Sequence, residues 1–202
     1  MSTPFRNAVL VRRSHRATTN KSPLSDAELE DLIKFAVNHS PSSFNSQTSR
    51  VVLLLKEESV KFWEHGKETA QKKLDGDHLA GKLNQFSGFQ KAYGTVLIYE
   101  DMSIIPGFQA KFPAMKDLLP EWQLHGSGIL QFVIWTALAE AGLGASLQHA
   151  QAYTEADAAV NYSIPSTWKL VGQLPFGAVP EGTVLPEKSF APIDDRVKVF
   201  GK

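Results

Sequence analysis

The chain has 202 residues, of which 43% are hydrophobic and 21% are charged, the balance of an ordinary globular protein rather than a disordered one. Lysine plus arginine and aspartate plus glutamate both count 21, so the formal net charge is zero, which argues against nucleic acid or an anionic membrane as a partner. Cysteine is absent, which excludes disulfides, thiolate nucleophiles and zinc–cysteine sites.

Targeting and membrane signals are weak along the chain. The N-terminal residues contain no continuous apolar segment with a small-residue cleavage site, so we predict no signal peptide. The most apolar run, residues 128–145, is interrupted by Gln131 and Glu140 and is short for a membrane span. No repeat or Gly/Ser linker divides the sequence. We therefore expect a cytoplasmic protein with a single domain over residues 1–202 and no metal site.

The first half of the chain contains three predicted elements. Ser25 and Glu28 form a capping box, in which each side chain satisfies a free backbone N–H of a first helical turn. Apolar residues follow at helical spacing, and Pro41 ends this helix. The run "RVVLLL" at 50–55 predicts a buried strand. Residues 57–75 predict a helix with a polar face.

The second half mixes strands and helices. "GTVLIYED" (94–101) predicts a second buried strand, and the Pro-, Phe- and Gly-rich residues 105–120 predict a long loop or a broken helix. Residues 127–141 are apolar on all sides of a helix, which predicts a helix buried in the core or shared with a second subunit. We expect a third strand at 168–177 and a final one at 196–200. Without a regular βαβ alternation, the fold class is α+β.

The segment "VRRSHRATTN" (11–20) carries a cluster of cations. Arg12, Arg13 and Arg16 flank Ser14, and guanidinium groups with a hydroxyl suit phosphate oxygens. A helix over 5–13 followed by a turn would make these side chains converge. The alternative is a solvated basic patch on the surface.

The loop "HSPSSFNSQTSR" (39–50) is dense in short hydroxyl and amide side chains and lies between a predicted helix and a predicted strand. Such groups often hydrogen-bond their own backbone in turns. The functional alternative is a set of donors and acceptors for a polar heterocycle, because loops at such positions frequently carry binding residues.

Four motifs in this order resemble one known family. "RRSHR" (12–16) and "PSSFNSQ" (41–47) are followed by "EAGLGASLQH" (140–149) after the apolar helix and by "VGQLPFGAVPE" (171–181) in the third buried strand. Together they cover nearly the whole chain and resemble the FMN-dependent nitroreductase family. The resemblance is strongest to its small branch of fungal fatty-acid-repression proteins and bacterial stress-induced nitroreductases.

The resemblance implies a nitroreductase-like fold, with a central mixed or antiparallel sheet flanked by helices. It further implies an obligate homodimer with two FMN sites between the subunits. The long apolar helix would lie in the dimer interface, and the C-terminal arm would wrap the partner. A stress-response role would follow from the branch.

The family's cofactor-binding positions transfer to this sequence residue by residue. Arg12, Arg13, Ser14 and Arg16 match the first motif, with Arg12 implied to bind the phosphate and Arg16 to reach the pyrimidine side of the ring, where positive charge stabilises the reduced flavin. The other implied cofactor contacts are Pro41, Ser42, Ser43, Asn45 and Gln47 in the second motif, Asn84, and Leu147, Gln148 and His149 along the edge of the ring.

The C-terminal arm departs from the family pattern. Many members carry Lys-x-Arg followed by proline, with the arginine on the phosphate, whereas this chain has Lys188 but Phe190. We expect Arg196, or Lys188 together with Arg196, to supply the missing charge. His149 also stands where some relatives have an acidic residue, which bears on substrate preference.

The implied activity is the reduction of nitroaromatics, quinones or related acceptors by NADH or NADPH. Hydride would pass through flavin N5 in a ping-pong cycle, and no catalytic side chain is required. Phe108, Phe112 and Trp122 either line the acceptor side or pack as ordinary core. Two alternatives remain: a flavin-binding stress or lipid-regulatory protein with incidental reductase activity, and a basic-patch interaction module without a cofactor.

Overall fold

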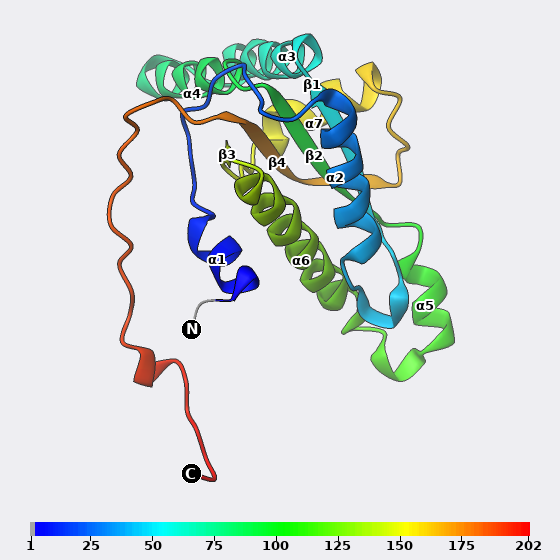
Figure 1. Ribbon diagram of the computed structural model, residues 1–202. Coiled ribbons are helices and arrows are strands. Elements are labelled where there is room, and N and C mark those ends of the chain that lie inside the picture. The colour runs from blue at the N-terminus through cyan, green and yellow to red at the C-terminus, as the bar shows by residue number, and fades with distance from the viewer. Residues whose placement is uncertain (1–2) are drawn as a thin grey trace.

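The structure, a computed structural model, describes residues 3–202 (Figure 1). Its helices are α1 (Pro4–Val11), α2 (Asp26–His39), α3 (Glu57–Lys73), α4 (Gly76–Phe89), α5 (Ile105–Lys111), α6 (Leu119–Glu140) and α7 (Gln151–Asn161). Its strands are β1 (Ser49–Leu55), β2 (Gly94–Asp101), β3 (Leu143–Ala145) and β4 (Trp168–Ala178). Short 3-10 turns form η1 (Ser43–Asn45), η2 (Pro113–Met115) and η3 (Ile193–Asp195).

The described strands form one antiparallel sheet in the order β1-β2-β4-β3. Strand β2 lies in the middle and is buried along its whole length, as its unbroken apolar centre "TVLIY" requires. Its Leu97 lies opposite Val52 of β1 and Gln173 of β4. The architecture is α+β with an antiparallel sheet, as the sequence predicts.

Helices cover both faces of the sheet (Figure 1). Because successive side chains of a strand point to opposite faces, Val96 and Ile98 pack with α2 and α6, whereas Leu97 and Tyr99 pack with α3, α4 and α7. The result is a three-layer arrangement with a hydrophobic core on each side of the sheet. Within the described residues, no helix combines the length and the apolar character needed to cross a membrane.

Several predicted elements are confirmed. The capping box of α2 is present, since the backbone N–H of Ser25 donates to the carboxylate of Glu28 (2.8 Å) and the backbone N–H of Glu28 donates to Ser25 Oγ (3.3 Å). The three predicted strands correspond to β1, β2 and β4; β2 and most of β4 are buried, whereas the predicted burial of β1 is wrong, because at this edge of the sheet only its Leu54 is buried in the single chain. The proline-rich stretch 105–120 is a broken helix made of α5, η2 and the first residues of α6.

The predicted final strand at 196–200 is wrong for the single chain. These residues are exposed and belong to no strand; the C-terminal arm runs away from the sheet after β4 (Figure 1). The alternation of Val197 and Val199 is typical of a strand, but a strand also requires a neighbouring backbone to bond, and the arm has none in its own chain.

Helix α6 is longer than its apolar segment suggests, and it is not covered on every side. Ile129 and Phe132 remain 41% and 38% exposed, so the expectation of burial all round fails within one chain. Helices α4 and α7 and the short strand β3 were not predicted. Gly81 and Gly88 weaken the helical pattern of α4, and β3 has only three residues.

Candidate functional site

The arginine-rich segment is attached to the edge of the sheet. Helix α1 ends at Val11, and the chain then extends along β3, where the backbone N–H of His15 donates to the carbonyl oxygen of Ala145 (2.9 Å). The approach is close, because a Cβ built on Gly144 would lie 2.8 Å from the Cβ of His15. This attachment determines where the arginine side chains can reach.

We use the term arginine pocket for the cavity of about 620 Å³ between residues 12–17 and 183–190. Arg12, Arg13, Ser14 and Arg16 line it, together with Lys188 from the C-terminal arm. The two segments are held together by hydrogen bonds: Arg13 Nη2 donates to the carbonyl of Pro186 (2.5 Å), and Lys188 Nζ donates to that of Leu10 (3.0 Å).

The cations of the arginine pocket have no acidic partners. Among residues 3–202, no ion pair within 4.0 Å involves Arg12, Arg13, Arg16 or Lys188. Burial, and then the nearby charge of Arg13, lower the pKa of His15, so this residue adds no positive charge at neutral pH. Four unneutralised cations around one cavity have the charge and the N–H donors that suit an anion such as a phosphate group.

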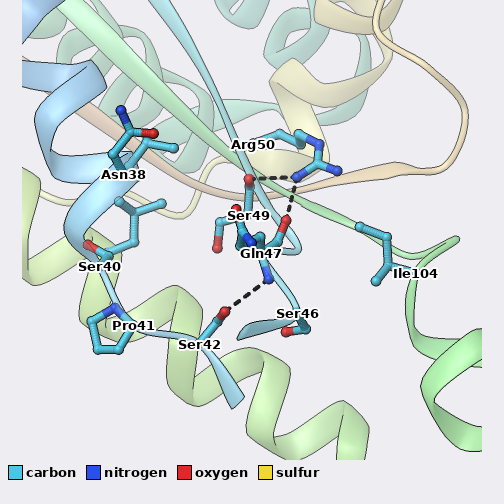
Figure 2. Close-up of a pocket in the computed structure, with 12 residues that line it drawn as sticks. Asn38, Ser40, Pro41, Ser42, Ser46, Gln47, Ser49, Arg50 and Ile104 are labelled. Carbon is cyan, nitrogen blue, oxygen red and sulfur yellow. Dashed lines mark hydrogen bonds between the residues drawn. The ribbon is translucent and has the colours of Figure 1, made fainter. Parts of the chain in front are cut away.

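The polar loop, residues 40–50, lines a second cavity of about 370 Å³ (Figure 2). Pro41, Ser42 and Gln47 face this cavity, but Ser43 and Asn45 are not among its lining residues. The backbone N–H of Gln47 donates to Ser42 Oγ (2.9 Å) and closes the loop. The motif therefore forms a compact polar wall, although Ser43 and Asn45, two of the residues predicted to contact the cofactor, do not line this cavity in the single chain.

The backbone of the polar loop is strained. Phe44, Asn45 and Gln47 have φ values of 55°, 52° and 48°, in the left-handed region that non-glycine residues rarely occupy. Three such residues within four positions persist only where the surroundings over-determine them, and such strain is concentrated at binding and catalytic sites.

Aromatic rings cluster beside the polar loop. The ring of Phe44 stacks on that of Phe112, with centroids 4.6 Å apart, and Trp122 and Phe108 lie 6.0 and 6.3 Å from it. Sequence reasoning named the last three residues but missed Phe44, which is 47% exposed. The structure thus brings α5, η2 and α6 together with the loop at one aromatic surface.

A buried carboxylate is hydrogen-bonded to the C-terminal end of the polar loop. Glu100 at the end of β2 is 1% exposed and accepts hydrogen bonds from Thr48 Oγ1 and Ser49 Oγ, both at 2.6 Å. Sequence reasoning missed this residue, because the contact depends on the register that places Ser49 opposite Glu100.

The predicted positions 147–149 continue from β3. The backbone of Gln148 exchanges two hydrogen bonds with that of Gln173 (2.7 and 3.0 Å), Leu147 packs against the core, and His149 is exposed. Gln85 Nε2 of α4 donates to Gln148 Oε1 (3.2 Å), which brings the neighbouring, exposed Asn84 to this region. Arg196 lies beyond η3 in the exposed arm and does not line the arginine pocket.

Helix α6 separates the two cavities. Gly126 lines the cavity of the polar loop, and a Cβ built on it would lie 3.6 Å from Ser42. Nine positions later, the ring of Trp135 supports Arg12. At about 100° and about 1.5 Å per residue, the two residues lie on opposite faces of the helix and about 13 Å apart along its axis. Figure 1 shows the arginine segment and the polar loop on opposite sides of α6.

The fold and the site define a class of α+β protein with an arginine-lined pocket on one face of a long helix and a polar and aromatic surface on the other. The chain belongs to the nitroreductase family, a family of oxidoreductases, since the family model matches residues 9–178. The curated nitroreductase FRM2 of Saccharomyces cerevisiae is 30% identical over 190 residues, which make up 91% of this chain and 91% of that protein.

Solved structures agree with this assignment. The nitroreductase CinD from Lactococcus lactis, in complex with chloramphenicol, has a TM-score of 0.85 and 35% identity and covers 98% of this chain and 100% of its own. A nitroreductase from Desulfitobacterium hafniense with bound FMN shares the fold, with a TM-score of 0.70, 20% identity and 100% coverage of both chains.

Proposed function

We propose that the chain, as a single domain over residues 1–202, is an FMN-dependent oxidoreductase that uses NADH or NADPH to reduce nitroaromatics, quinones or related acceptors. The observation that carries this proposal is the arginine pocket, whose cations have no acidic partner within the described chain. Its volume of about 620 Å³ also lies in the range of ordinary small-molecule sites.

The residues of the arginine pocket suit the phosphate end of FMN. Arg12 and Arg13 offer planar guanidinium donors, Ser14 offers a hydroxyl, and Lys188 adds a third positive charge from the arm. We assign the charge missing from the family's arm motif to Lys188, because it lines the pocket in the same chain. Arg196 would contribute only through a rearrangement of the arm or from a second chain.

The flat, polar ring of FMN requires a different surface, and the second motif supplies one. We assign Pro41, Ser42, Ser43, Asn45 and Gln47 to this role, with Asn84, Leu147, Gln148 and His149 along the ring's edge and Arg16 at its pyrimidine side. The polar loop is preformed by its own hydrogen bonds, so little conformational entropy remains to be lost on binding.

The opposite-face arrangement on α6 supports a homodimer. One bound nucleotide cannot contact Arg12 and the polar loop of the same chain when they lie on opposite faces of the helix. A second copy can bring its own polar loop to the arginine pocket of the first. Large apolar side chains remain exposed for such a contact: they are Phe5, Phe35, Leu124, Ile129 and Phe132.

The C-terminal arm is the second argument for a homodimer. Val184, Phe190 and Phe200 are 77–90% exposed, although each is a large apolar residue. An extended arm that leaves the body (Figure 1) can bury such side chains on a second copy. We therefore propose that the arm wraps the partner, as the resemblance implies.

FMN held by these residues would supply the redox chemistry, the transfer of hydride from a reduced nicotinamide to the acceptor in a ping-pong cycle. The chain's residues bind and orient the reactants. Arg16 places positive charge where negative charge develops, and the ring of Phe44 offers an exposed apolar surface for a planar acceptor. The nitroreductase CinD has been solved in complex with nicotinic acid and in complex with 4-nitrophenol, which supports a nicotinamide donor and nitro acceptors for this chain.

The test uses purified full-length protein. We expect a yellow protein with absorption bands near about 370 and about 450 nm, the usual positions for an oxidised flavin. NADH or NADPH should bleach the bands without oxygen, and 4-nitrophenol or a quinone should restore them. Light scattering should give twice the mass of the chain. A colourless monomer that does not bind added FMN would contradict the proposal.

A further inference from the structure

Arg50, the second residue of β1, connects the polar loop to the end of β2. Its Nη1 donates to the carbonyl oxygens of Gln47 (2.6 Å) and Ser49 (3.0 Å), as Figure 2 shows. Its Nη2 donates to the carboxylate of Asp101 (3.2 Å), and the guanidinium carbon lies 5.7 Å from the centroid of the Trp168 ring. The guanidinium therefore has partners along its edge and on its face.

The carbonyl that Arg50 holds belongs to a strained residue. Gln47 has a φ of 48°, and its peptide groups are fixed on both sides, by Ser42 Oγ at the N–H and by Arg50 at the carbonyl. A left-handed non-glycine residue costs about 1–2 kcal/mol and relaxes unless contacts hold it. Arg50 provides the contact that links this residue to β2, through the carboxylate of Asp101.

Asp101 extends the connection to the next segment. The same carboxylate accepts hydrogen bonds from the backbone N–H (3.1 Å) and Oγ (2.6 Å) of Ser103, just before α5. Burial raises the pKa of Asp101, but hydrogen bonds from Ser103 and Thr167 and the charge of Arg50 outweigh it, so that the pKa lies below its ordinary value. Asp101 is therefore ionised and ties Arg50 to the segment that carries the rings stacked on Phe44.

We propose that Arg50 is a positioning residue for the flavin and acceptor site: it bridges the carbonyl of Gln47 to Asp101 and so holds the polar loop at one geometry against α5. This inference rests on the proposed function, because it concerns the same site. Arg50 lines the cavity of the polar loop, but the hydrogen bonds of its guanidinium go to Gln47, Ser49 and Asp101. Its effect passes through the orientation of Gln47 and Phe44.

The first test measures the loop without any cofactor. We compare Arg50→Gln, which removes both the planar guanidinium donors and the positive charge, with Arg50→Lys, which keeps the charge but lacks the planar donors. Lys67→Gln is the matched control, since Lys67 is also partly buried and bonds a carboxylate and an amide oxygen, at Glu64 and Gln90. Hydrogen exchange of the flavin-free full chain should be about tenfold faster at residues 44–49 in Arg50→Gln, as for a loss of about 1.4 kcal/mol. Arg50→Lys should be intermediate and the control unchanged.

The second test separates positioning from general stability. Titration of the flavin-free protein should give a Kd for FMN about tenfold higher in Arg50→Gln, and the flavin-loaded variant should have a KM for 4-nitrophenol about tenfold higher, the factor that corresponds to the loss of about 1.4 kcal/mol expected for the loop. For Arg50→Gln we expect a kcat at saturation within about twofold of the wild-type value and a Tm equal to that of Lys67→Gln. For Arg50→Lys we expect a KM close to that of the wild type.

Two results would overturn the inference. One is loop exchange, Kd and KM in Arg50→Gln that match those of Lys67→Gln. The other is a parallel fall of kcat and Tm with no change in KM and no recovery in Arg50→Lys, which marks a purely structural residue. If the wild-type chain binds no FMN, the proposed function fails, and with it the role of Arg50 in a flavin site. The hydrogen-exchange data would still decide whether Arg50 holds the loop.

Discussion

The guanidinium carbon of Arg12 lies 4.5 Å from the centroid of the Trp135 ring, and the indole N–H of Trp135 donates to the carbonyl oxygen of Ala145 (3.1 Å). The central helix and the edge strand together thus orient one arginine of the pocket. A guanidinium stacked on a ring keeps its N–H groups free at the edge, where oxygens of an anion can approach.

Arg12→Ala should weaken FMN binding by about 2–4 kcal/mol, because it removes one or two charge-assisted hydrogen bonds to the phosphate. The quantity to measure is the Kd, by fluorescence titration of flavin-free protein with FMN. Arg6→Ala is the control, since Arg6 is an exposed arginine of α1 that does not line the arginine pocket. Equal affinities for the two variants would remove Arg12 from the site.

Lys188→Ala should release FMN, whereas Arg196→Ala should retain it. The reason is position: Lys188 lines the arginine pocket, and Arg196 lies in the exposed arm outside it. The measurement is the ratio of flavin to protein after gel filtration. Loss of FMN from Arg196→Ala with retention in Lys188→Ala would reverse the assignment and imply that the arm delivers Arg196 to another chain.

Phe44→Leu should raise the KM for a nitroaromatic acceptor about threefold to tenfold, since an aromatic pair contributes about 0.5–1.5 kcal/mol beyond its buried area. Leucine keeps apolar bulk at a half-exposed position but cannot stack. Steady-state kinetics with 4-nitrophenol and with ferricyanide provide the comparison, because ferricyanide has no ring to stack. A similar rise in KM for both acceptors would indicate that Phe44 maintains the structure of the loop and does not stack on the acceptor.

Asp101 should make the free energy of unfolding fall with acid. Its folded-state pKa lies below the ordinary value, so its contribution to stability is fully present above about pH 4, where an unfolded aspartate is ionised. That contribution disappears as the pH falls through the lower folded-state pKa. Urea unfolding at a series of acidic pH values measures the free energy of unfolding. This free energy should depend less on pH in Asp101→Asn than in the wild type, whereas Glu181→Gln, at an exposed position, should have the pH dependence of the wild type. Identical slopes for all three proteins would contradict the assignment.

Local signals in the sequence predicted what depends on local geometry. The capping box placed the start of α2, and the apolar runs placed β1 and β2. The short spacing of Arg12, Arg13 and Arg16 left a convergent site and a solvated surface patch as alternatives, and the structure places all three around one cavity. In each case, residues close in the chain determine the feature.

The sequence did not predict features that depend on the pairing register of two strands or on the presence of a neighbouring backbone. The contact of Ser49 with Glu100 requires the β1–β2 register, and the role of Phe44 requires a left-handed backbone that bulky residues seldom adopt. The strand predicted at 196–200 failed for the related reason that side-chain alternation says nothing about whether a neighbouring backbone is present.

Helix α6 carries Gly126 and Trp135 on opposite faces, and this has a genetic consequence for the proposed dimer. Each active centre would combine the cations of one copy with the loop of the other. A hybrid made from an Arg12→Ala copy and a Gln47→Ala copy would therefore concentrate both lesions in one centre and leave the other intact. The purified hybrid dimer should have about half of normal turnover, since one of its two centres works. Two defective alleles whose products pair at random should complement each other to about a quarter, because only about half of the dimers are hybrids.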